Sequence, residues 1–547
     1  MQATFAATIF DEWIRSGLRD VVVCPGSRST PLALACAYRK ELTLHVRIDE
    51  RSAGFFAIGR SLSTRRPVAI VVTSGSAAAE LHAAVAEADL ANVALLVLSA
   101  DRPPELHGVG APQTIEQRQL YGGMVRSFEE PGVARMEVAG SWRALAGRLW
   151  SRCAGESGRP GPVHLNAAFC EPLVGDPREL PEGRNDGARW NQFFSTRVET
   201  PLIDVNGQRV LAVVGQGVSA EIIDQCRALE WVVLGDATAQ GTTAYFDPLL
   251  RDEDFANEVK PDLVVRLGGN PASKVLSERL REWKVRTVAL LGAGPVADPD
   301  GLISESFTGL PSGDVALLRA DGDYARLWSR ASQSVGDYLR AQESDFDELD
   351  EPMVARTVVE VCGEQNVPLV IGSSMPFRDV EWWAGTRRSA TYANRGANGI
   401  DGVISTALGV SAGDKGVGYV GDLTMLHDVS GLVDGLGRAG GTCVLVVADN
   451  RGGGIFSFLS QAVVLEDQRF ELLFGTPRNH DLASVASAFG HVGLEASTRA
   501  ELRTAMAKGL TSTGVTVVVA KVPSREENVR RHALLNDAVQ HRRRGSV

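Results

Sequence analysis

The feature that most constrains the fold of this chain is a repeated alternation of short apolar runs with segments of helical periodicity. In the first third, the runs DVVV (20–23), PVAIVV (67–72) and VALLVLS (93–99) each lead into a polar or glycine-rich loop. Strands buried on both faces read as continuous apolar runs, and their alternation with helices is typical of βαβ units. The sequence therefore predicts an α/β fold in which mostly parallel sheets are covered by helices.

Two breaks divide this alternation into three parts. The Pro-, Gly- and charge-rich stretch GDPRELPEGRNDG (175–187) is typical of a linker, and the acidic stretch ESDFDELDE (343–351) marks a second boundary. A chain of 547 residues is long enough for three or four domains of roughly 150 residues each. We predict three α/β domains at residues 1–180, 190–340 and 352–547, called here the N-terminal, central and C-terminal units.

Composition argues against several classes of partner. The formal net charge of −11 disfavours nucleic acid as the main partner, and no apolar run approaches the roughly 18 residues that a membrane span needs. The seven cysteines are dispersed without a C-x-x-C pair, which favours a reducing compartment over a disulfide framework or a zinc site. The stretch MQATFAATIFDEWIRSG (1–17) predicts an amphipathic helix and lacks the features of a signal peptide. We therefore expect a cytoplasmic protein that binds neither nucleic acid nor membrane.

Two polar side chains follow apolar runs in the C-terminal unit. Asp422 comes directly after GVGYVG (416–421), and Asn450 comes after CVLVVAD (443–449), with one helical segment between them. Ligands of open α/β sheets bind at the carboxyl ends of strands, and a carboxylate with an amide oxygen suits Mg²⁺. The glycines at 452–454 would let a phosphate approach the backbone without a Cβ in the way. Either motif alone is typical of a turn, but the pair at two strand ends predicts a metal-bridged diphosphate site.

This pair resembles the signature of the thiamin diphosphate-dependent enzymes, which begins with Gly-Asp and ends in Asn. Here Gly421 and Asp422 begin the signature and Asn450 ends it, although Leu423 stands where the family usually has glycine. Within the family, the chain is similar over nearly its whole length to the synthases of menaquinone biosynthesis that join 2-oxoglutarate to isochorismate. The stretches that carry this similarity are CPGSRSTPL (24–32), RIDERSAGF (47–55), VTSGSA (72–77), SADRPPEL (99–106), GAPQTIEQ (110–117) and NRGANGIDG (394–402).

The resemblance implies an activity, cofactors and an assembly. The implied enzyme is a transferase that decarboxylates 2-oxoglutarate and adds the resulting succinyl-semialdehyde carbanion to isochorismate in a conjugate, Stetter-like reaction. The implied cofactors are thiamin diphosphate and Mg²⁺, or Mn²⁺ in its place. The family also implies a homodimer or homotetramer with active sites at the subunit interfaces.

Glu50 is implied as the catalytic residue. In this family a glutamate between a strand and a helix hydrogen-bonds N1′ of the aminopyrimidine ring and so assists removal of the thiazolium C2 proton. The metal ligands implied by the resemblance are Asp422, Asn450 and Gly452. The implied cofactor-binding residues are Glu50, Ser373, Ile400, Gly421, Asp422, Leu423, Asn450, Gly452, Gly453, Ile455 and Phe456.

Four arginines in predicted loops, Arg28, Arg102, Arg378 and Arg395, are the candidates for binding anions. Arginine binds planar carboxylates in a bidentate manner, and the two implied substrates carry four carboxylates between them. The full set of implied substrate-binding residues is Ser27, Arg28, Arg102, Gln113, Lys274, Ser374, Arg378, Arg395, Phe456 and Leu459. Two positions depart from the pattern, because Pro112 stands where these synthases often have asparagine and Val275 where they have a second basic residue.

Three other functions remain open from the sequence. GQGVSA (215–220), with Asp236 about 20 residues on, resembles a dinucleotide-binding loop and would suit an FAD-containing relative such as acetolactate synthase. A catalytically silent subunit of the same fold would not need both Glu50 and the metal pair. A plain decarboxylase of 2-oxo acids would not need so many cations for a second, multiply charged substrate.

Overall fold

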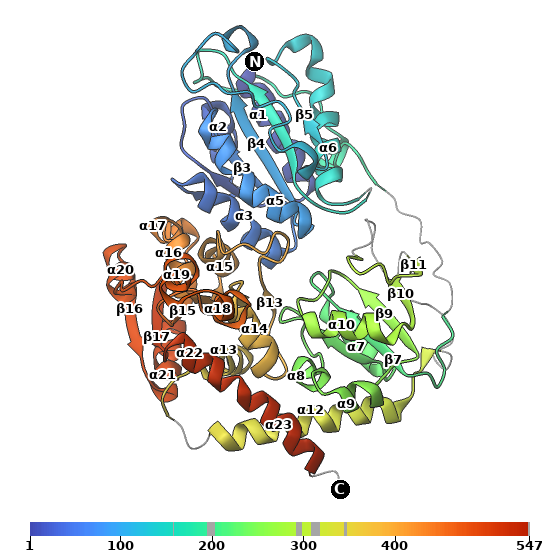
Figure 1. The fold of residues 1–547 in the computed structure, drawn as a ribbon. Coiled ribbons are helices and arrows are strands. Elements are labelled where there is room, and N and C mark those ends of the chain that lie inside the picture. Colours follow the sequence, from blue (N-terminus) through green and yellow to red (C-terminus); the bar gives the residue numbers. More distant parts are fainter. Residues whose placement is uncertain (157, 194–202, 291–297, 308–317, 344–346, 545–547) are drawn as a thin grey trace.

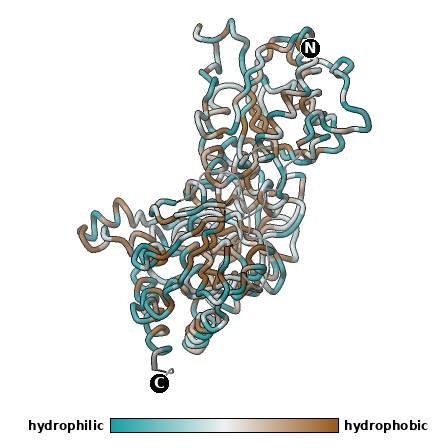
Figure 2. The backbone as a smooth tube through the Cα atoms, turned by 90° about the vertical axis from the view of Figure 1, so that its right-hand side faces the viewer, coloured by the Kyte–Doolittle hydropathy of each residue, from teal (hydrophilic) through white to brown (hydrophobic). Residues whose placement is uncertain are grey.

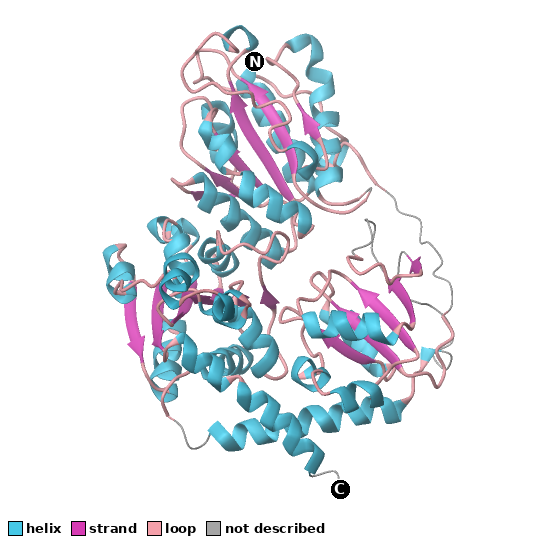
Figure 3. Cartoon of the chain, in the orientation of Figure 1, coloured by secondary structure: helices cyan, strands magenta, loops and turns pink. Residues whose placement is uncertain are grey.

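The computed structural model describes residues 1–547 except 157, 194–202, 291–297, 308–317, 344–346 and 545–547. Three lobes are visible, each built on one sheet with helices against its faces (Figures 1 and 3). Every pairing between named strands of the described residues is parallel. The predicted α/β class with mostly parallel sheets is therefore confirmed.

The N-terminal unit has a six-stranded sheet in the order β2-β1-β3-β4-β6-β5. Its strands are β1 (Asp20–Val23), β2 (Thr43–Val46), β3 (Val68–Val72), β4 (Leu95–Asp101), β5 (Phe128–Glu129) and β6 (Val163–Ala168). Its helices are α1 (Gln2–Ser16), α2 (Thr30–Ala37), α3 (Glu50–Thr64), α4 (Ser76–Glu80), α5 (His82–Leu90) and α6 (Trp142–Cys153). The central strands β3 and β4 are buried throughout, and β4 is apolar up to Leu98, as expected for a sheet covered on both faces. Apolar residues gather in the middle of this unit (Figure 2).

The central unit has a five-stranded sheet in the order β11-β10-β9-β7-β8. Its strands are β7 (Val210–Val214), β8 (Val232–Gly235), β9 (Leu263–Leu267), β10 (Arg286–Leu290) and β11 (Glu305–Phe307). Its helices are α7 (Ala220–Ala228), α8 (Phe246–Leu250), α9 (Glu253–Glu258), α10 (Lys274–Trp283) and the long α12 (Gly322–Glu343).

The C-terminal unit repeats the architecture with the order β13-β12-β14-β15-β17-β16. Its strands are β12 (Leu369–Ile371), β13 (Thr391–Tyr392), β14 (Lys415–Gly421), β15 (Thr442–Asp449), β16 (Val492–Ala496) and β17 (Gly514–Lys521). Its helices are α13 (Glu351–Gln365), α14 (Met375–Trp383), α15 (Val403–Ser411), α16 (Asp422–His427), α17 (Gly431–Asp434), α18 (Gln461–Val464), α19 (Asp467–Phe470), α20 (Leu482–Ala488), α21 (Arg499–Leu510) and α22 (Arg525–Arg531). A short 3₁₀ helix, η6 (Gly454–Phe458), comes after β15.

The last helix, α23 (Ala533–Arg544), leaves the C-terminal unit and packs along α12 (Figure 1). Its buried residues Leu535, Ala538 and Val539 belong to the same apolar cluster as Leu211 of β7 and Trp328 of α12. The core of the central unit is thus completed by a segment that begins more than 300 residues after β7 in the chain.

Helix α3 of the N-terminal unit packs closely against α15 of the C-terminal unit. A Cβ at Gly59 would overlap the backbone of Thr406, and a Cβ at Gly409 would overlap the carbonyl oxygen of Phe56. Apolar residues of both helices share one core cluster. Glycine at both contact points therefore lets the two backbones approach directly.

Candidate functional site

Asp422 and Asn450 lie at the carboxyl ends of two neighbouring strands. Strand β14 pairs with β15 in parallel register, with Gly421 opposite Ala448. Asp422 directly follows β14 and is the first residue of α16, while Asn450 directly follows β15. Both side chains are buried. Their proximity is a result of the register alone, since parallel strands that end together place their next residues at one edge of the sheet.

The Asp422 carboxyl group lies in a water-poor and acidic surrounding. Burial, together with the charge of Asp449, raises the pKa of Asp422 to about 7, although the Leu423 N–H donates to its Oδ1 at 2.8 Å. A carboxylate that is costly to ionise alone is stabilised by a cation at the same place. The group therefore has the chemistry expected of a metal ligand.

The Asn450 amide is held on both sides. Its Nδ2 donates to Oε1 of Glu351 at 2.7 Å, and its Oδ1 accepts the Gly452 N–H at 3.1 Å. Gly452 has φ +147°, and a Cβ there would overlap the carbonyl oxygen of Gly475. The chain thus turns so tightly after β15 that only glycine fits.

These residues fit a divalent metal and a diphosphate. Among the residues that the structure describes, no group of three or more His, Cys, Asp or Glu side chains could hold a metal ion. The carboxylate, the amide oxygen and the Gly452 carbonyl are the oxygen donors that could contribute to the shell of an ion whose octahedron is completed by phosphate and water. The Oγ of Ser373 is buried without a hydrogen-bond partner in the described chain, as expected of a group whose partner is a ligand.

Glu50 is the first residue of α3. Strand β2 ends at Val46, so three residues separate the strand from this helix, and Asp49 caps the helix by accepting the Ser52 N–H at 2.9 Å. The Glu50 side chain is half-buried, and burial is the main cause that raises its pKa. A rigid helix start therefore presents a carboxyl group that is easily protonated.

Ser27, Arg28, Arg102 and Gln113 come from loops at the carboxyl edge of the N-terminal sheet. The Nη1 of Arg102 donates to Ser74 Oγ at 2.7 Å, and Ser74 Oγ donates to the carbonyl of Gln113 at 3.0 Å. Burial and the charge of Arg28 both lower the pKa of Arg102. The two positive charges are therefore close enough to repel each other, and a bound anion would relieve that repulsion.

Ser374, Arg378 and Arg395 form a second group, in the C-terminal unit. Arg378 donates to the carbonyl of Ser374 at 3.0 Å, and the Arg395 guanidinium lies 4.3 Å from the ring centroid of Phe377. Burial and the nearby Arg395 charge contribute to a lowered pKa of Arg378. The prediction that Arg378 lies in a loop is wrong, because Met375–Trp383 form α14; its Pro376 stands in the first turn, where the missing N–H costs nothing.

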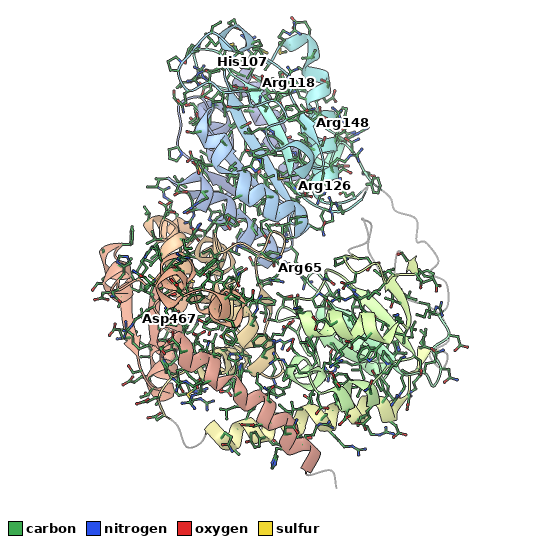
Figure 4. All side chains as sticks on the ribbon, viewed as in Figure 1. Arg65, His107, Arg118, Arg126, Arg148 and Asp467 are labelled. Atoms are coloured by element: carbon green, nitrogen blue, oxygen red, sulfur yellow. The ribbon has the colours of Figure 1, made fainter. Side chains whose placement is uncertain are left out.

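Within this chain, the loop that carries Arg395 contacts the N-terminal unit near the amino ends of its strands, whereas Arg102 lies at their carboxyl ends. The N–H of Gly396, next to Arg395, donates to Glu87 near the end of α5, and α5 leads into the start of β4. Arg102 comes after the end of β4, and seven strand residues span about 23 Å. His107, whose Nε2 lies 2.9 Å from the Arg102 carbonyl, and Arg65, which comes directly after α3, lie at opposite ends of this unit (Figure 4).

Apolar candidates line the region after β15 and the start of α15. The ring centroid of Phe456 in η6 lies 5.3 Å from that of Phe474, and Ile455 beside it is half-buried, while Leu459 is 41% exposed. Ile400 precedes Gly402 by two residues, and a Cβ at Gly402 would overlap the Phe55 ring of α3. Ile400 therefore lies beside the helix that Glu50 begins.

Lys274 stands apart from the other candidates. Its side chain is 86% exposed at the start of α10, and its described ion pair is with Glu278 at 3.5 Å.

The possible dinucleotide site lacks an available carboxylate for the ribose. Asp236 is buried, and its Oδ1 accepts hydrogen bonds from the N–H and the Oγ1 hydroxyl of Thr238 in its own turn. That carboxylate is thus engaged inside the protein.

A cavity of about 630 Å³ lies between α12 and α13. Arginines 227, 340, 356 and 388 contribute to its lining, but none of the predicted site residues does. The predicted site, at the carboxyl ends of β14 and β15, is therefore not part of this cavity.

Sequence reasoning missed a buried carboxyl pair behind Asn450. Glu351 opens α13, and Asp379 lies in α14; burial and their mutual proximity raise the pKa of Glu351 well above its usual range. The acidic stretch 343–351 predicted only a boundary. The signal available was the helix start Asp350-Glu351-Pro352, in which Asp350 accepts the Met353 N–H at 2.8 Å.

Comparisons with known proteins agree with the geometry. The family model "Thiamine pyrophosphate enzyme, N-terminal TPP binding domain" matches residues 3–120, and the corresponding C-terminal TPP binding domain matches residues 379–520. A 2-succinyl-5-enolpyruvyl-6-hydroxy-3-cyclohexene-1-carboxylate synthase of Myxococcus xanthus is 36% identical, with 98% of this chain and 97% of the relative covered. Proteins of the same name from Thermobifida fusca and Saccharopolyspora erythraea are 37% and 38% identical, with 98% and 89% of this chain and 98% and 90% of the relatives covered.

Proposed function

From the premise that the chain belongs to the 2-succinyl-5-enolpyruvyl-6-hydroxy-3-cyclohexene-1-carboxylate synthases, a branch of the thiamine pyrophosphate enzymes, we propose how its residues divide the work. The chain is a transferase of menaquinone biosynthesis that removes CO₂ from 2-oxoglutarate. It adds the remaining four-carbon unit to isochorismate in a conjugate, Stetter-like reaction, which gives 2-succinyl-5-enolpyruvyl-6-hydroxy-3-cyclohexene-1-carboxylate. The observation that carries this conclusion is the 36% identity over 98% of the chain.

The metal and diphosphate would be held at the ends of β14 and β15. Asp422, the Asn450 amide oxygen and the Gly452 carbonyl would bind Mg²⁺ or Mn²⁺, and the metal would bind the diphosphate. Thiamin diphosphate, when bound, supplies a carbon nucleophile and an electron sink for the loss of CO₂. Two observations support this assignment: the Ser373 hydroxyl has no hydrogen-bond partner among the described residues, and the buried Asp422 carboxylate would be stabilised by a cation. The remaining cofactor contacts would come from Ile400, Gly421, Leu423, Gly453, Ile455 and Phe456.

Glu50 would hold a hydrogen bond to a ring nitrogen of the aminopyrimidine. Its raised pKa and its place at the start of a packed helix support the role, since a carboxyl group that shares a proton must be held rigidly. Glu50 would thereby hold a proton at that ring nitrogen.

The arginines would bind the substrate carboxylates. We assign Arg395 and Ser374 to 2-oxoglutarate, and Arg102 and Gln113 to isochorismate. Each pair includes an arginine held by its own neighbours, which lowers the entropy lost on binding. Ser27, Arg28, Lys274, Arg378, Phe456 and Leu459 would complete the substrate contacts.

Two copies of the chain would complete each active site, in a homodimer or homotetramer. The observation that supports this is that the Arg395 loop contacts the N-terminal unit near the amino ends of its strands, whereas Arg102 follows the carboxyl end of β4. In the same chain, Arg51 donates to the His427 carbonyl, at the end of α16 that lies away from Asp422. A second copy of the chain could place the carboxyl edge of its N-terminal sheet against the carboxyl ends of β14 and β15 in the first copy.

Domain boundaries and location complete the proposal. The three sheets fall inside residues 1–180, 190–340 and 352–547, which supports these ranges as the pyrimidine-binding, central and diphosphate-binding domains. The cytoplasm is supported by the seven cysteines, which are all free thiols. None of the helices in the described ranges is both long and apolar enough to span a membrane.

The test is a direct assay. Purified protein is incubated with thiamin diphosphate, Mg²⁺, 2-oxoglutarate and isochorismate, and the product is identified by mass spectrometry. We expect the succinyl adduct of isochorismate to form only when all four are present. Release of CO₂ without any adduct would identify a plain decarboxylase instead.

A further inference from the structure

The orientation of the Asn450 amide depends on one buried carboxyl group. The oxygen and nitrogen ends of an amide have nearly the same shape, so hydrogen-bond partners decide which end points where. Glu351 Oε1 accepts from Nδ2 at 2.7 Å, and the Gly452 N–H donates to Oδ1 at 3.1 Å. With the nitrogen turned inward to Glu351, the oxygen is left at the strand end where a metal would bind.

Glu351 is itself fixed from behind. It is 2% exposed at the start of α13, and the fully buried Asp379 of α14 lies next to it. The Nε2 of His532 lies 3.2 Å from Asp379 Oδ1. The His532 ring has its centroid 5.2, 5.3 and 4.8 Å from the rings of Trp382, Trp383 and Phe458. The carboxyl group that faces Asn450 therefore has little freedom to turn away.

We propose that Glu351 is a positioning residue of the metal site, which holds the Asn450 amide oxygen toward the ion through its hydrogen bond to Nδ2. The inference rests on the proposed metal role of Asn450. Groups that orient a metal ligand are typically worth 10- to 100-fold in metal affinity. Asp379 and His532 act one step further back, by holding Glu351 in place.

The experiment measures Mg²⁺ affinity as the Mg²⁺ dependence of thiamin diphosphate binding, followed by tryptophan fluorescence of the full chain. Glu351→Met removes the acceptor and should weaken Mg²⁺ binding by about 10- to 100-fold. Glu351→Gln keeps an oxygen that can accept from Nδ2 and should stay within about threefold of the parent. Glu381→Met is the matched control, because Glu381 is a buried carboxyl group of α14, and it should leave the Mg²⁺ dependence unchanged.

A double-mutant cycle separates positioning from general stability. In an Asn450→Ala background there is no amide to orient, so Glu351→Met should cause no further loss of Mg²⁺ affinity. An equal loss in both backgrounds, or equal losses for Glu351→Gln and Glu351→Met, would overturn the proposal. If Glu351→Met fails to fold by circular dichroism, Glu351→Asp takes its place, since its shorter side chain pulls the acceptor back from Nδ2.

A last comparison separates this proposal from the metal site itself. If Asp422→Ala removes the Mg²⁺ dependence and Glu351→Met does not change it, only the role of Glu351 is wrong. If Asp422→Ala also leaves the Mg²⁺ dependence intact, the metal lies elsewhere and both assignments are wrong.

Discussion

Glu50 combines half-burial, a raised pKa and a rigid helix start, and its role rests on the carboxyl group alone. Glu50→Gln keeps the shape but cannot share a proton in the same way. Turnover should fall by roughly 10²- to 10⁴-fold, the usual value of acid–base assistance. Steady-state kinetics measures this loss, and thiamin diphosphate affinity should stay close to the parent value. Near-normal turnover would remove Glu50 from the mechanism.

Asp422 is the one formal anion in the proposed metal shell. Asp422→Ala should therefore abolish the Mg²⁺-dependent part of thiamin diphosphate binding. Titration calorimetry with and without Mg²⁺ checks this. An unchanged affinity in the presence of Mg²⁺ would place the ion at another site.

The two arginine groups should separate by substrate. A lost charge-assisted contact costs about 1.5–3 kcal/mol, or roughly one to two decades in apparent affinity. Arg395→Ala should raise the KM for 2-oxoglutarate far more than that for isochorismate, and Arg102→Ala should do the reverse. Arg102→Ala should also still release CO₂ from 2-oxoglutarate alone. If it does not, Arg102 serves the first substrate or the cofactor.

At this scale, the sequence could predict residues that end strands. Asp422 and Asn450 come directly after long apolar runs, and parallel register alone brings them together. Glu351 could not be found the same way, because its burial depends on α14, whose residues come later in the chain. A charged residue in an acidic stretch looks solvated until the structure shows which helix covers it.

At the scale of elements, the stability of the contact of α3 with α15 and α16 should depend on pH. Asp428, directly after α16, accepts from the Ser405 N–H at 2.7 Å and from Ser405 Oγ at 3.1 Å. Burial is the main cause that raises the pKa of Asp428 to about 6, from an ordinary value of 3.8. The folded state therefore holds this proton more tightly than the unfolded chain, so the contribution of Asp428 to stability falls as pH rises from about 4 to about 6.

Asp428→Asn should remove that pH dependence. The unfolding free energy of the parent, relative to the variant, should drop by at most about 3 kcal/mol between pH 4 and pH 6. Thermal unfolding of both proteins across this range measures the difference. Parallel pH profiles would mean that the Asp428 proton is not linked to folding.

The elements themselves could be predicted well where apolar runs are long. Strands β14 and β15 appear where the sequence predicts them. The edge strand β16 (Val492–Ala496) gives a weaker signal, because most of its residues are only partly buried. The close contact through Gly59 and Gly409 gives no local signal at all, since a glycine inside a helix looks the same whether or not another helix touches it.

For the whole molecule, the question is whether one copy or two build an active site. Glu50→Gln and Asp422→Ala should each be inactive alone. If the N-terminal unit of one copy serves the C-terminal unit of another, a mixed dimer of the two variants has one site with both residues intact. Mixing, with subunit exchange, should therefore restore activity. No recovery in a verified mixed oligomer would mean that each chain uses its own Glu50.

The relative placement of the units lies beyond sequence reasoning. Alternating runs predict three sheets, but the surfaces that join them depend on helix faces far apart in the chain, such as α3 and α15. Helix α23 is the clearest case: it comes after the last strand of the C-terminal unit, yet its apolar residues enter the core of the central unit.

That last helix has a consequence for how the protein is made. A ribosome releases residues 210–343 long before it releases Ala533–Arg544, so the part of the α12 surface that α23 covers stays exposed until then. Chains of this size usually fold domain by domain as they are synthesised. In this chain, the apolar core of the central unit can be completed only when the end of the chain has been translated. A ribosome stalled shortly before codon 533 would therefore present a nascent chain whose second domain is unfinished and prone to bind chaperones.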